Sequence, residues 1–386
     1  MPFTRRDLLK ATSVAALTLP SGLWTLRRNP RAPLKILFIG GTGFIGPHMV
    51  REALTRGHRV TLFNRGRTNP QLFPEVEKLV GDRDGGLGVL KGRSWDAVID
   101  TSGYVPRVVR ASIDLLKNNV RRYVFISSGD AYASFAKVGL DEDEPLDVLD
   151  DPKSEDASKH YGAFKAICER SVREVYAGRH TILRPGWIIG PGDNNDISSY
   201  WPMRIARGGE VLAPGSPTDP TQIIDARDLA GFVIKSIEED INGTFNTVGP
   251  ASPLSWAEFL YGIRAVTNSA VRFTWVDADF LAQRKVLPWT DLPIWWPPRD
   301  DYQQPPMFEP GGKGFAQMSG RRALAAGLTF RPLADTARDI IAEYRGRPKD
   351  PNRRPQIFGL TPEREAATLA AWHELGARPS ELGTRP

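Results

Sequence analysis

The stretch LKILFIGGTGFIG, residues 34–46, decides the fold of this chain. Its first half, LKILFI, is an apolar run typical of a strand that is buried on both faces of a sheet. Glycines follow at 40, 43 and 46, and a helical pattern with Pro47 in its first turn begins directly after them. A glycine turn between a strand and a helix lets backbone amides approach a phosphate closely, and the helix N-terminus adds positive potential. The stretch therefore predicts a cradle for a dinucleotide pyrophosphate, with a glycine turn that binds no ligand as the alternative.

Short apolar runs continue to alternate with helical segments as far as residue 190. The strand-like runs are HRVTLF, EKLV, DAVID, RRYVFISS and HTILRP, and a long helical stretch covers residues 158–176. Continuous apolar strands separated by helices are typical of a parallel sheet covered on both faces. We therefore predict an α/β fold, a doubly wound parallel-sheet Rossmann domain followed by a smaller C-terminal part.

The amino-acid composition changes after Pro191, where Gly, Pro and Trp become more frequent. Residues 288–310 contain too much proline to form regular helices or strands. The predicted parts are a signal segment at 1–30, the Rossmann domain at 31–190 with a return near 221–248, a second part at 191–220 and 249–345, and a linker with a last helix at 346–386.

The N-terminal segment is typical of targeting. TRRDLLK at 4–10 is charged, and the apolar run ATSVAALTLP that follows it is too short to span a bilayer as a stable helix. Adjacent arginines followed by two leucines and a lysine match the twin-arginine pattern. We expect export by that route to the periplasm or beyond. The alternative is a basic N-terminal helix of a cytoplasmic protein, and the cleavage site stays open because no Ala-x-Ala lies near Pro20.

Charge is concentrated at the N-terminus. The chain has 386 residues and a net charge of +6, but residues 1–35 contain seven Lys and Arg against a single acidic residue, Asp7. The remainder is balanced at 44 basic and 44 acidic residues. A neutral body argues against a protein held mainly by phosphate contacts, so we expect no nucleic-acid partner.

The residues that commonly bind metals are sparse. The single cysteine, Cys168, is expected to be a packed core thiol, and the five histidines are scattered without ligand spacing. We therefore predict no metal site. No apolar stretch reaches membrane-spanning length, so we expect no stable membrane anchor beyond the signal segment.

Cofactor selectivity depends on the end of the second predicted strand. An acidic residue that holds the ribose 2′-hydroxyl of NAD usually stands there, whereas HRVTLFNRG has Asn64 and Arg65. NAD is the expected cofactor, and NADP stays open. Asp82 in VGDRD is a candidate acceptor for the adenine amino group, with a simple turn aspartate as the alternative.

Tyr161 and Lys165 in HYGAFK are the candidate catalytic pair. They lie four residues apart on a predicted helix and so share a face. A free tyrosine titrates near pKa 10, and a nearby ammonium and an oxidised nicotinamide both favour the phenolate. Ser128 in FISSGDAY ends a predicted strand, where its hydroxyl could share the proton of a substrate. The alternative for such a pair is an amphipathic helix surface, against which its position 118 residues beyond Gly43 argues.

Several features occur together between residues 34 and 345: GGTGFIG at 40–46, Ser128 four residues before Tyr132, Tyr161 with Lys165, LRPG at 183–186 leading to GPG at 190–192, and IDARDLA at 224–230. By these features the chain resembles the extended short-chain dehydrogenase/reductase family, which includes the sugar-nucleotide epimerases and dehydratases. The resemblance implies proton transfer by Tyr161, contact of Lys165 with the nicotinamide ribose and contact of Ser128 with the substrate hydroxyl.

The resemblance also implies a cofactor site, a substrate-binding part and a dimer. Substrate would bind to the smaller C-terminal substrate-binding part, and a homodimer would form through the helices after Val105 and around Tyr161. Gly129–Asp130 only half matches the Asp-Glu pair of the dehydratases, so Asp130 is either a second acid or base or a turn residue. The candidate cofactor-binding residues are Gly40, Gly43, Phe44, Ile45, Gly46, Asn64, Arg65, Asp82 and Lys165.

Aromatic residues gather in the proline-rich stretch. Flat rings suit the C–H face of a sugar or an apolar aglycone, although core packing under a long loop is an equal alternative. Arg204 is a candidate partner for an anionic group, with a solvated helix face as the alternative. The aromatic candidates are Trp289, Trp295, Trp296, Tyr302 and Phe308.

Export and a dinucleotide together constrain the chemistry. Outside the cell no cofactor pool replaces a spent dinucleotide, so an exported enzyme must return the hydride that it removes. We expect an NAD(P)-dependent epimerase/dehydratase-type enzyme that retains its cofactor and acts on a sugar-like or polyol-like small molecule. The alternatives are an NADPH-consuming carbonyl reductase inside the cell and a non-catalytic nucleotide- or RNA-binding member of the family.

Overall fold

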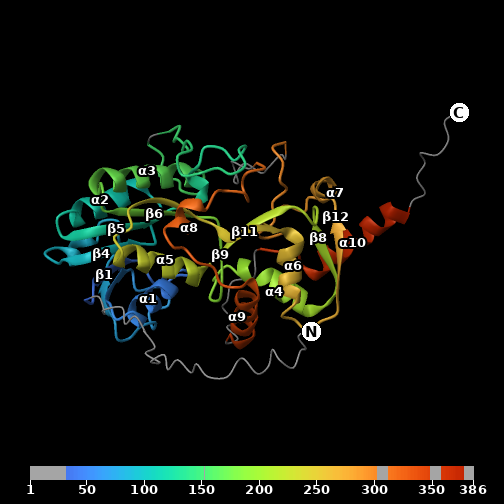
Figure 1. The fold of residues 1–386 in the computed structure, drawn as a ribbon, viewed down its shortest axis with the longest axis horizontal. Coiled ribbons are helices and arrows are strands. Elements are labelled where there is room, and N and C mark those ends of the chain that lie inside the picture. The colour runs from blue at the N-terminus through green and yellow to red at the C-terminus, as the bar shows by residue number, and fades with distance from the viewer. Residues whose placement is uncertain (1–31, 152, 302–311, 348–357, 378–386) are drawn as a thin grey trace, which may run out of the picture. The chain divides into compact units, whose positions relative to one another are not determined.

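A seven-stranded parallel sheet is the centre of the fold (Figure 1), in the strand order β10-β6-β5-β4-β1-β2-β3. The computed structural model describes residues 32–151, 153–301, 312–347 and 358–377. The predicted signal segment, Tyr302 and Phe308 lie outside the described residues. The strands of the sheet are β1 Lys35–Ile39, β2 Arg59–Asn64, β3 Glu77–Val80, β4 Trp95–Asp100, β5 Val120–Ile126, β6 His180–Pro185 and β10 Gly243–Thr247.

Helices cover both faces of this sheet, as the apolar runs predict (Figure 1). Side chains of a strand alternate between the two faces, and in β1 the residues Ile36 and Phe38 join one core cluster while Leu37 and Ile39 join another. All four side chains are fully buried. The predicted doubly wound Rossmann-type α/β fold is therefore confirmed. The helices against the first cluster are α1 Gly46–Thr55 and α5 Ala226–Glu238, and those against the second are α2 Pro106–Leu116 and α3 Tyr161–Val175.

Cys168 belongs to the second of these clusters and is fully buried. The expectation of a packed core thiol is confirmed.

The C-terminal part has its own core, which lies among two small sheets and several helices. One sheet has the order β11-β9-β7 and the other pairs β12 with β8. The elements are β7 Trp187–Ile189, α4 Ile197–Arg207, β8 Gly209–Pro214, β9 Pro220–Asp225, β11 Gly249–Ser255, α6 Trp256–Arg264, β12 Val271–Val276, α7 Ala278–Gln283, α8 Arg321–Ala325, α9 Leu333–Gly346 and α10 Pro362–Ala377, with short 3-10 turns η1 Leu87–Leu90 and η2 Gly129–Ala131 in the first part.

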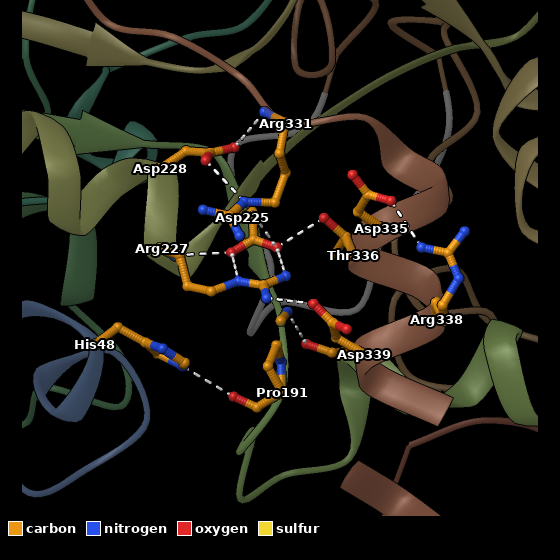
Figure 2. A network of polar contacts seen from close by, with 12 residues as sticks. His48, Pro191, Asp225, Arg227, Asp228, Arg331, Asp335, Thr336, Arg338 and Asp339 are labelled. Atoms are coloured by element: carbon orange, nitrogen blue, oxygen red, sulfur yellow. Dashed lines mark hydrogen bonds and ion pairs between the residues drawn. The ribbon is translucent and has the colours of Figure 1, made fainter. Parts of the chain in front are cut away.

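The IDARDLA motif ties α5 to α9 (Figure 2). Asp225 caps α5 by accepting a hydrogen bond from the amide of Arg227 at 2.8 Å. The same carboxylate accepts from the hydroxyl of Thr336 in α9 at 2.7 Å. Asp228 accepts from both the amide and the guanidinium of Arg331 at 2.9 and 2.8 Å. Hydrogen bonds to a charged carboxylate are stronger than bonds between neutral groups. The motif therefore holds α9 and the residue Arg331 before it against α5.

A buried carboxylate holds α10 against the rest of the C-terminal part. Glu365 accepts from Arg204 at 2.5 Å, from Arg207 at 2.9 Å and from the amide of Leu212 at 3.1 Å. Its side chain is only 4% exposed. Arg204 is therefore the partner of a structural carboxylate, and the expectations of a substrate anion or a solvated helix face are both wrong.

Among the described residues, no helix combines the length and the apolar composition needed to cross a membrane.

Replacing Glu365 with Gln should lower the free energy of unfolding by about 3 kcal/mol, because it leaves Arg204 buried without a counter-charge. Urea denaturation of the two proteins measures this difference. Glu363→Gln is the matched control, since Glu363 lies on the exposed side of the same helix turn and its loss should cost less than about 0.5 kcal/mol. Equal losses in both variants would contradict the structural role of Glu365.

Candidate active site

A cavity of about 1230 Å³ opens where the parallel strands of the large sheet end. Its lining includes the glycine turn after β1, the ends of β2, β4 and β5, and the start of α3. Because parallel strands end at the same edge of a sheet, groups far apart in sequence meet there. Tyr161, Lys165 and Ser128, together with all the predicted cofactor-binding residues, line this one cavity.

The glycines of the turn have different steric roles. A Cβ at Gly40 would lie 2.3 Å from the hydroxyl of Thr101, and one at Gly46 would lie 2.6 Å from the backbone of Gly41. A Cβ at Gly43 would meet no protein atom within 4 Å, because Gly43 faces the open cavity. Two of the glycines are therefore needed for backbone packing, and the third leaves room for a ligand.

The N-terminus of α1 adjoins this turn. Its N-cap residue, Ile45, provides no side-chain hydrogen bond to the first amides of the helix. The first amides of any helix lack carbonyl partners within it, and an anion can satisfy them. The residues present thus fit the pyrophosphate of a dinucleotide.

Asn64 is engaged by the protein backbone. Its amide donates to the carbonyl of Gly40 at 3.2 Å and its oxygen accepts from the amide of Gly66 at 2.8 Å. Arg65 and Arg67 are exposed at the same end of the cavity, and within the described part of the chain neither makes a hydrogen bond or an ion pair. Asn64 thus shapes the turn, whereas the two guanidinium groups are available to a ligand.

Asp82 also lies in the lining. One of its carboxylate oxygens accepts from the amide of Asp84 at 3.0 Å, as in a simple turn. The turn role that the sequence suggested is therefore present, and an adenine contact would be additional to it.

Tyr161 and Lys165 lie on the first turns of α3. The ammonium of Lys165 donates to the carbonyl of Ile126 at 2.9 Å, and the side chain is buried. The ammonium also lies 5.1 Å from the ring centroids of Tyr104 and Phe125 and 5.5 Å from that of Tyr161. Lys165 is thus fixed between the end of β5 and three aromatic rings.

Ser128 connects Tyr161 with a buried carboxyl group. Its hydroxyl donates to Asp130 at 3.0 Å and accepts from the amide of the same residue at 3.2 Å. Ser128 also interacts with the phenol of Tyr161 and acts to lower its pKa. Asp130 therefore takes part in the turn after β5 and also lines the cavity. The hydroxyl of Ser128 lies between the carboxyl group of Asp130 and Tyr161.

Burial governs the protonation of these groups. It raises the pKa of Tyr161 well above the usual value, and the neighbouring Asp130 and Tyr104 raise it further. Burial also raises the pKa of Asp130 and lowers the pKa of Lys165 to about 8. In the protein without a nicotinamide, desolvation of the phenolate dominates, so the pKa of Tyr161 stays high despite the nearby ammonium.

The tryptophans of the proline-rich stretch separate into two groups. Trp289 and Trp296 line the cavity together with Trp187 and Phe315. Trp295 is instead 1% exposed, and its indole donates to Asp219 at 3.0 Å. Among the described tryptophans of this stretch, core packing is the correct interpretation for Trp295, and Trp296 is also buried at 6% exposure although it lines the cavity. Trp187 and Phe315 are among the cavity residues that the sequence did not single out, and the position of Trp187 directly after LRPG was the available signal.

Metal-binding groups are absent from the described parts of the chain, where no three His, Cys, Asp or Glu side chains cluster suitably.

Known proteins resemble this chain in part. A model described as the NAD dependent epimerase/dehydratase family matches residues 107–247. The chain is 28% identical over 212 residues to the chloroplast stem-loop binding protein of 41 kDa b from Arabidopsis thaliana, which covers 51% of this chain and 53% of that protein. It is also 28% identical over 232 residues to a 2-alkyl-3-oxoalkanoate reductase from Stenotrophomonas maltophilia, covering 52% of this chain and 64% of the reductase. The matches thus span about half to two thirds of these relatives.

Solved structures share the fold over a longer range. MoeE5 in complex with UDP-glucose and NAD has a TM-score of 0.54 and 20% identity, over 81% of this chain and 98% of that one. A UDP-N-acetylglucosamine 4-epimerase from Bacillus cereus has a TM-score of 0.57 and 18% identity, over 82% and 99% of the two chains. At such identities the likeness concerns the fold. The family model adds a resemblance to the NAD dependent epimerase/dehydratase family over residues 107–247.

Proposed function

We propose that this protein is an NAD(P)-dependent oxidoreductase of the epimerase/dehydratase type that removes a hydride from a sugar-like or polyol-like substrate and returns it. The observation that carries the proposal is the convergence of Tyr161, Ser128 and Lys165 on the cavity that the glycine turn opens. Proton-transfer groups and a phosphate cradle at one strand edge are what hydride removal from an alcohol requires.

The dinucleotide would occupy the cavity from β1 toward α3. The amides around Gly43 and Ile45 would hold its pyrophosphate, Asp82 its adenine and Lys165 its nicotinamide ribose. Bound there, it supplies a hydride acceptor. Arg65 and Arg67 are suited to a 2′-phosphate, which favours NADP, whereas the similar solved structures contain NAD. Either form fits the cradle.

The proton of the substrate hydroxyl would leave through the chain from Tyr161 to Ser128 to Asp130. Tyr161 holds its own proton in the protein by itself because burial raises its pKa. It can therefore accept a proton only if it releases one, and Ser128, which interacts with the phenol, hydrogen-bonds with the carboxyl group. Asp130, whose pKa burial raises, is the terminal acceptor in this scheme.

An NADPH-consuming carbonyl reductase is the second candidate. It is favoured by the exposed Arg65 and by the likeness to the 2-alkyl-3-oxoalkanoate reductase. A reductase needs a cofactor pool, so it fits a protein that stays in the cytoplasm. Export by the twin-arginine route belongs to the first proposal and rests on residues 4–20 of the sequence.

Gly43→Ala and Gly46→Ala should separate ligand binding from folding. The Gly43 variant should keep its free energy of unfolding without nucleotide but bind the dinucleotide at least about tenfold more weakly, because the new methyl group enters the phosphate space. The Gly46 variant should lose about 2 kcal/mol, since its methyl group meets the backbone of Gly41. Urea denaturation and nucleotide titration measure both. Unchanged affinity in Gly43→Ala would rule out this cradle.

Tyr161→Phe should lower turnover by about 100-fold or more, as expected for the loss of a proton-transfer group, while dinucleotide binding stays intact. The assay follows formation of the converted sugar or polyol on the loaded protein, because a cycle that returns the hydride accumulates no reduced dinucleotide. Tyr261→Phe is the matched control, because Tyr261 is an exposed tyrosine on α6 outside the cavity and its variant should keep full turnover. Turnover that survives in Tyr161→Phe would remove Tyr161 from the mechanism.

A further inference from the structure

One side of the cavity is an apolar surface of four rings, Trp187, Trp289, Trp296 and Phe315, here called the aromatic wall. The rings of Trp187 and Trp289 stack with centroids 5.7 Å apart and planes 25° apart. Phe315 contacts the rings of Trp187 and Trp296 at 5.4 and 5.5 Å. Trp187, Trp289 and Phe315 are only half-buried, so ring surface stays open to the cavity.

The loop that carries Trp289 has an unfavourable backbone. Trp289 has a φ of 62°, and Lys285 and Ile294 have φ values of 56° and 68°. The left-handed region costs a residue with a side chain roughly 1–2 kcal/mol, and a branched residue such as isoleucine is rarely found there. Such conformations persist only where surrounding contacts impose them, and they gather at functional sites.

The contacts that impose this conformation come from the segment before α10. The amide of Gly359 donates to the carbonyl of Thr290 at 2.7 Å, and the ring centroids of Phe358 and Trp289 lie 5.8 Å apart. Arg364 bonds with Asp291 in the same loop. Residues 358–364 thus hold the loop of Trp289 in place by contacts with Trp289, Thr290 and Asp291.

Among the lining residues that the structure describes, no unpaired positive charge lies at the aromatic wall. Arg65 and Arg67 follow β2, at the opposite end of the bound dinucleotide from the nicotinamide in the arrangement proposed above. The other cations of the described lining are engaged: Arg83 by Asp100 at 2.5 Å, Lys165 by the carbonyl of Ile126 at 2.9 Å and Lys159 by Asp156 at 3.4 Å. Diphosphates are typically held by charge-assisted donors such as arginine.

Carboxylates are present in the same lining. Asp130, Asp147, Asp150 and Asp193 all contribute to it. Ionised carboxylates repel an anionic substrate, whereas a neutral substrate meets no such repulsion.

We propose that the substrate carries an uncharged, flat apolar group, such as an aryl aglycone, that stacks on Trp187 and Trp289, and that this site does not select a nucleoside diphosphate. The inference rests on the proposed function, because the reacting hydroxyl must still reach Tyr161. Stacking on a rigid indole surface buries a large area at little entropic cost.

Three glucose derivatives with the same α configuration but different groups on the anomeric carbon test the proposal: naphthyl α-glucoside, methyl α-glucoside and UDP-glucose. Binding to the full-length protein saturated with dinucleotide is measured by calorimetry. We expect naphthyl glucoside to bind at least about tenfold more tightly than the other two, and Trp289→Ala to remove that advantage. Trp289→Phe should restore part of it. Trp275→Leu is the matched control, since Trp275 is a half-buried tryptophan on β12 outside the cavity.

The outcomes separate this inference from the proposed function. Tight binding of UDP-glucose that is unaffected by Trp289→Ala would overturn the inference, and so would the absence of any preference for the naphthyl probe. Naphthyl glucoside binding that depends on Trp289 supports it, and should persist in Tyr161→Phe. Failure of the proposed function would appear elsewhere, as loss of dinucleotide binding or as turnover that does not need Tyr161.

Discussion

The close backbone approach at the β1–α1 turn is the constraint on which the rest of the site depends. Gly46 lies so near the backbone of Gly41 that no side chain fits between them, and Gly40 is equally confined beside Thr101. This contact brings the N-terminus of α1 to the end of β1, with Gly43 facing the cavity. Because β5 is parallel to β1 through β4, the end of β5 reaches the same edge and delivers Ser128 there.

The sequence was sufficient where local patterns decide the structure. Buried parallel strands need continuous apolar runs, so the sheet could be predicted, and the spacing of Tyr161 and Lys165 put both on one helix. The sequence was insufficient where the position of a side chain depends on residues far away in the chain. Whether Trp289 or Trp295 faces the cavity depends on backbone strain and on Asp219, far from both in the chain. The partner of Arg204 is 161 residues away.

Protonation could not be predicted for the same reason. The spacing of Tyr161 and Lys165 suggested that an ammonium would stabilise a phenolate. Burial of both groups acts in the opposite direction, and only the folded chain determines how deep they lie. In the proposed mechanism this burial favours a relay through Ser128 to Asp130, because Tyr161 then passes its proton on without forming a free phenolate.

The two ends of the cavity differ in charge, and the difference suits a retained cofactor. Free guanidinium groups lie at the β2 end and an uncharged aromatic wall lies at the other. An arrangement with separate sites for a charged dinucleotide and a neutral substrate lets substrates exchange while the cofactor stays bound. Such a division is what an enzyme needs if it works where no cofactor pool exists.

The nucleotide content of the purified protein tests this account most directly. The full-length protein is denatured, and the released nucleotide is quantified and identified by mass and absorbance. We predict close to one oxidised dinucleotide per chain, and the presence or absence of a 2′-phosphate will show what Arg65 and Arg67 bind. A protein that is purified empty and binds NADPH reversibly would contradict the retained cycle and indicate a consuming reductase, and a protein that binds no dinucleotide at all would contradict the enzymatic account.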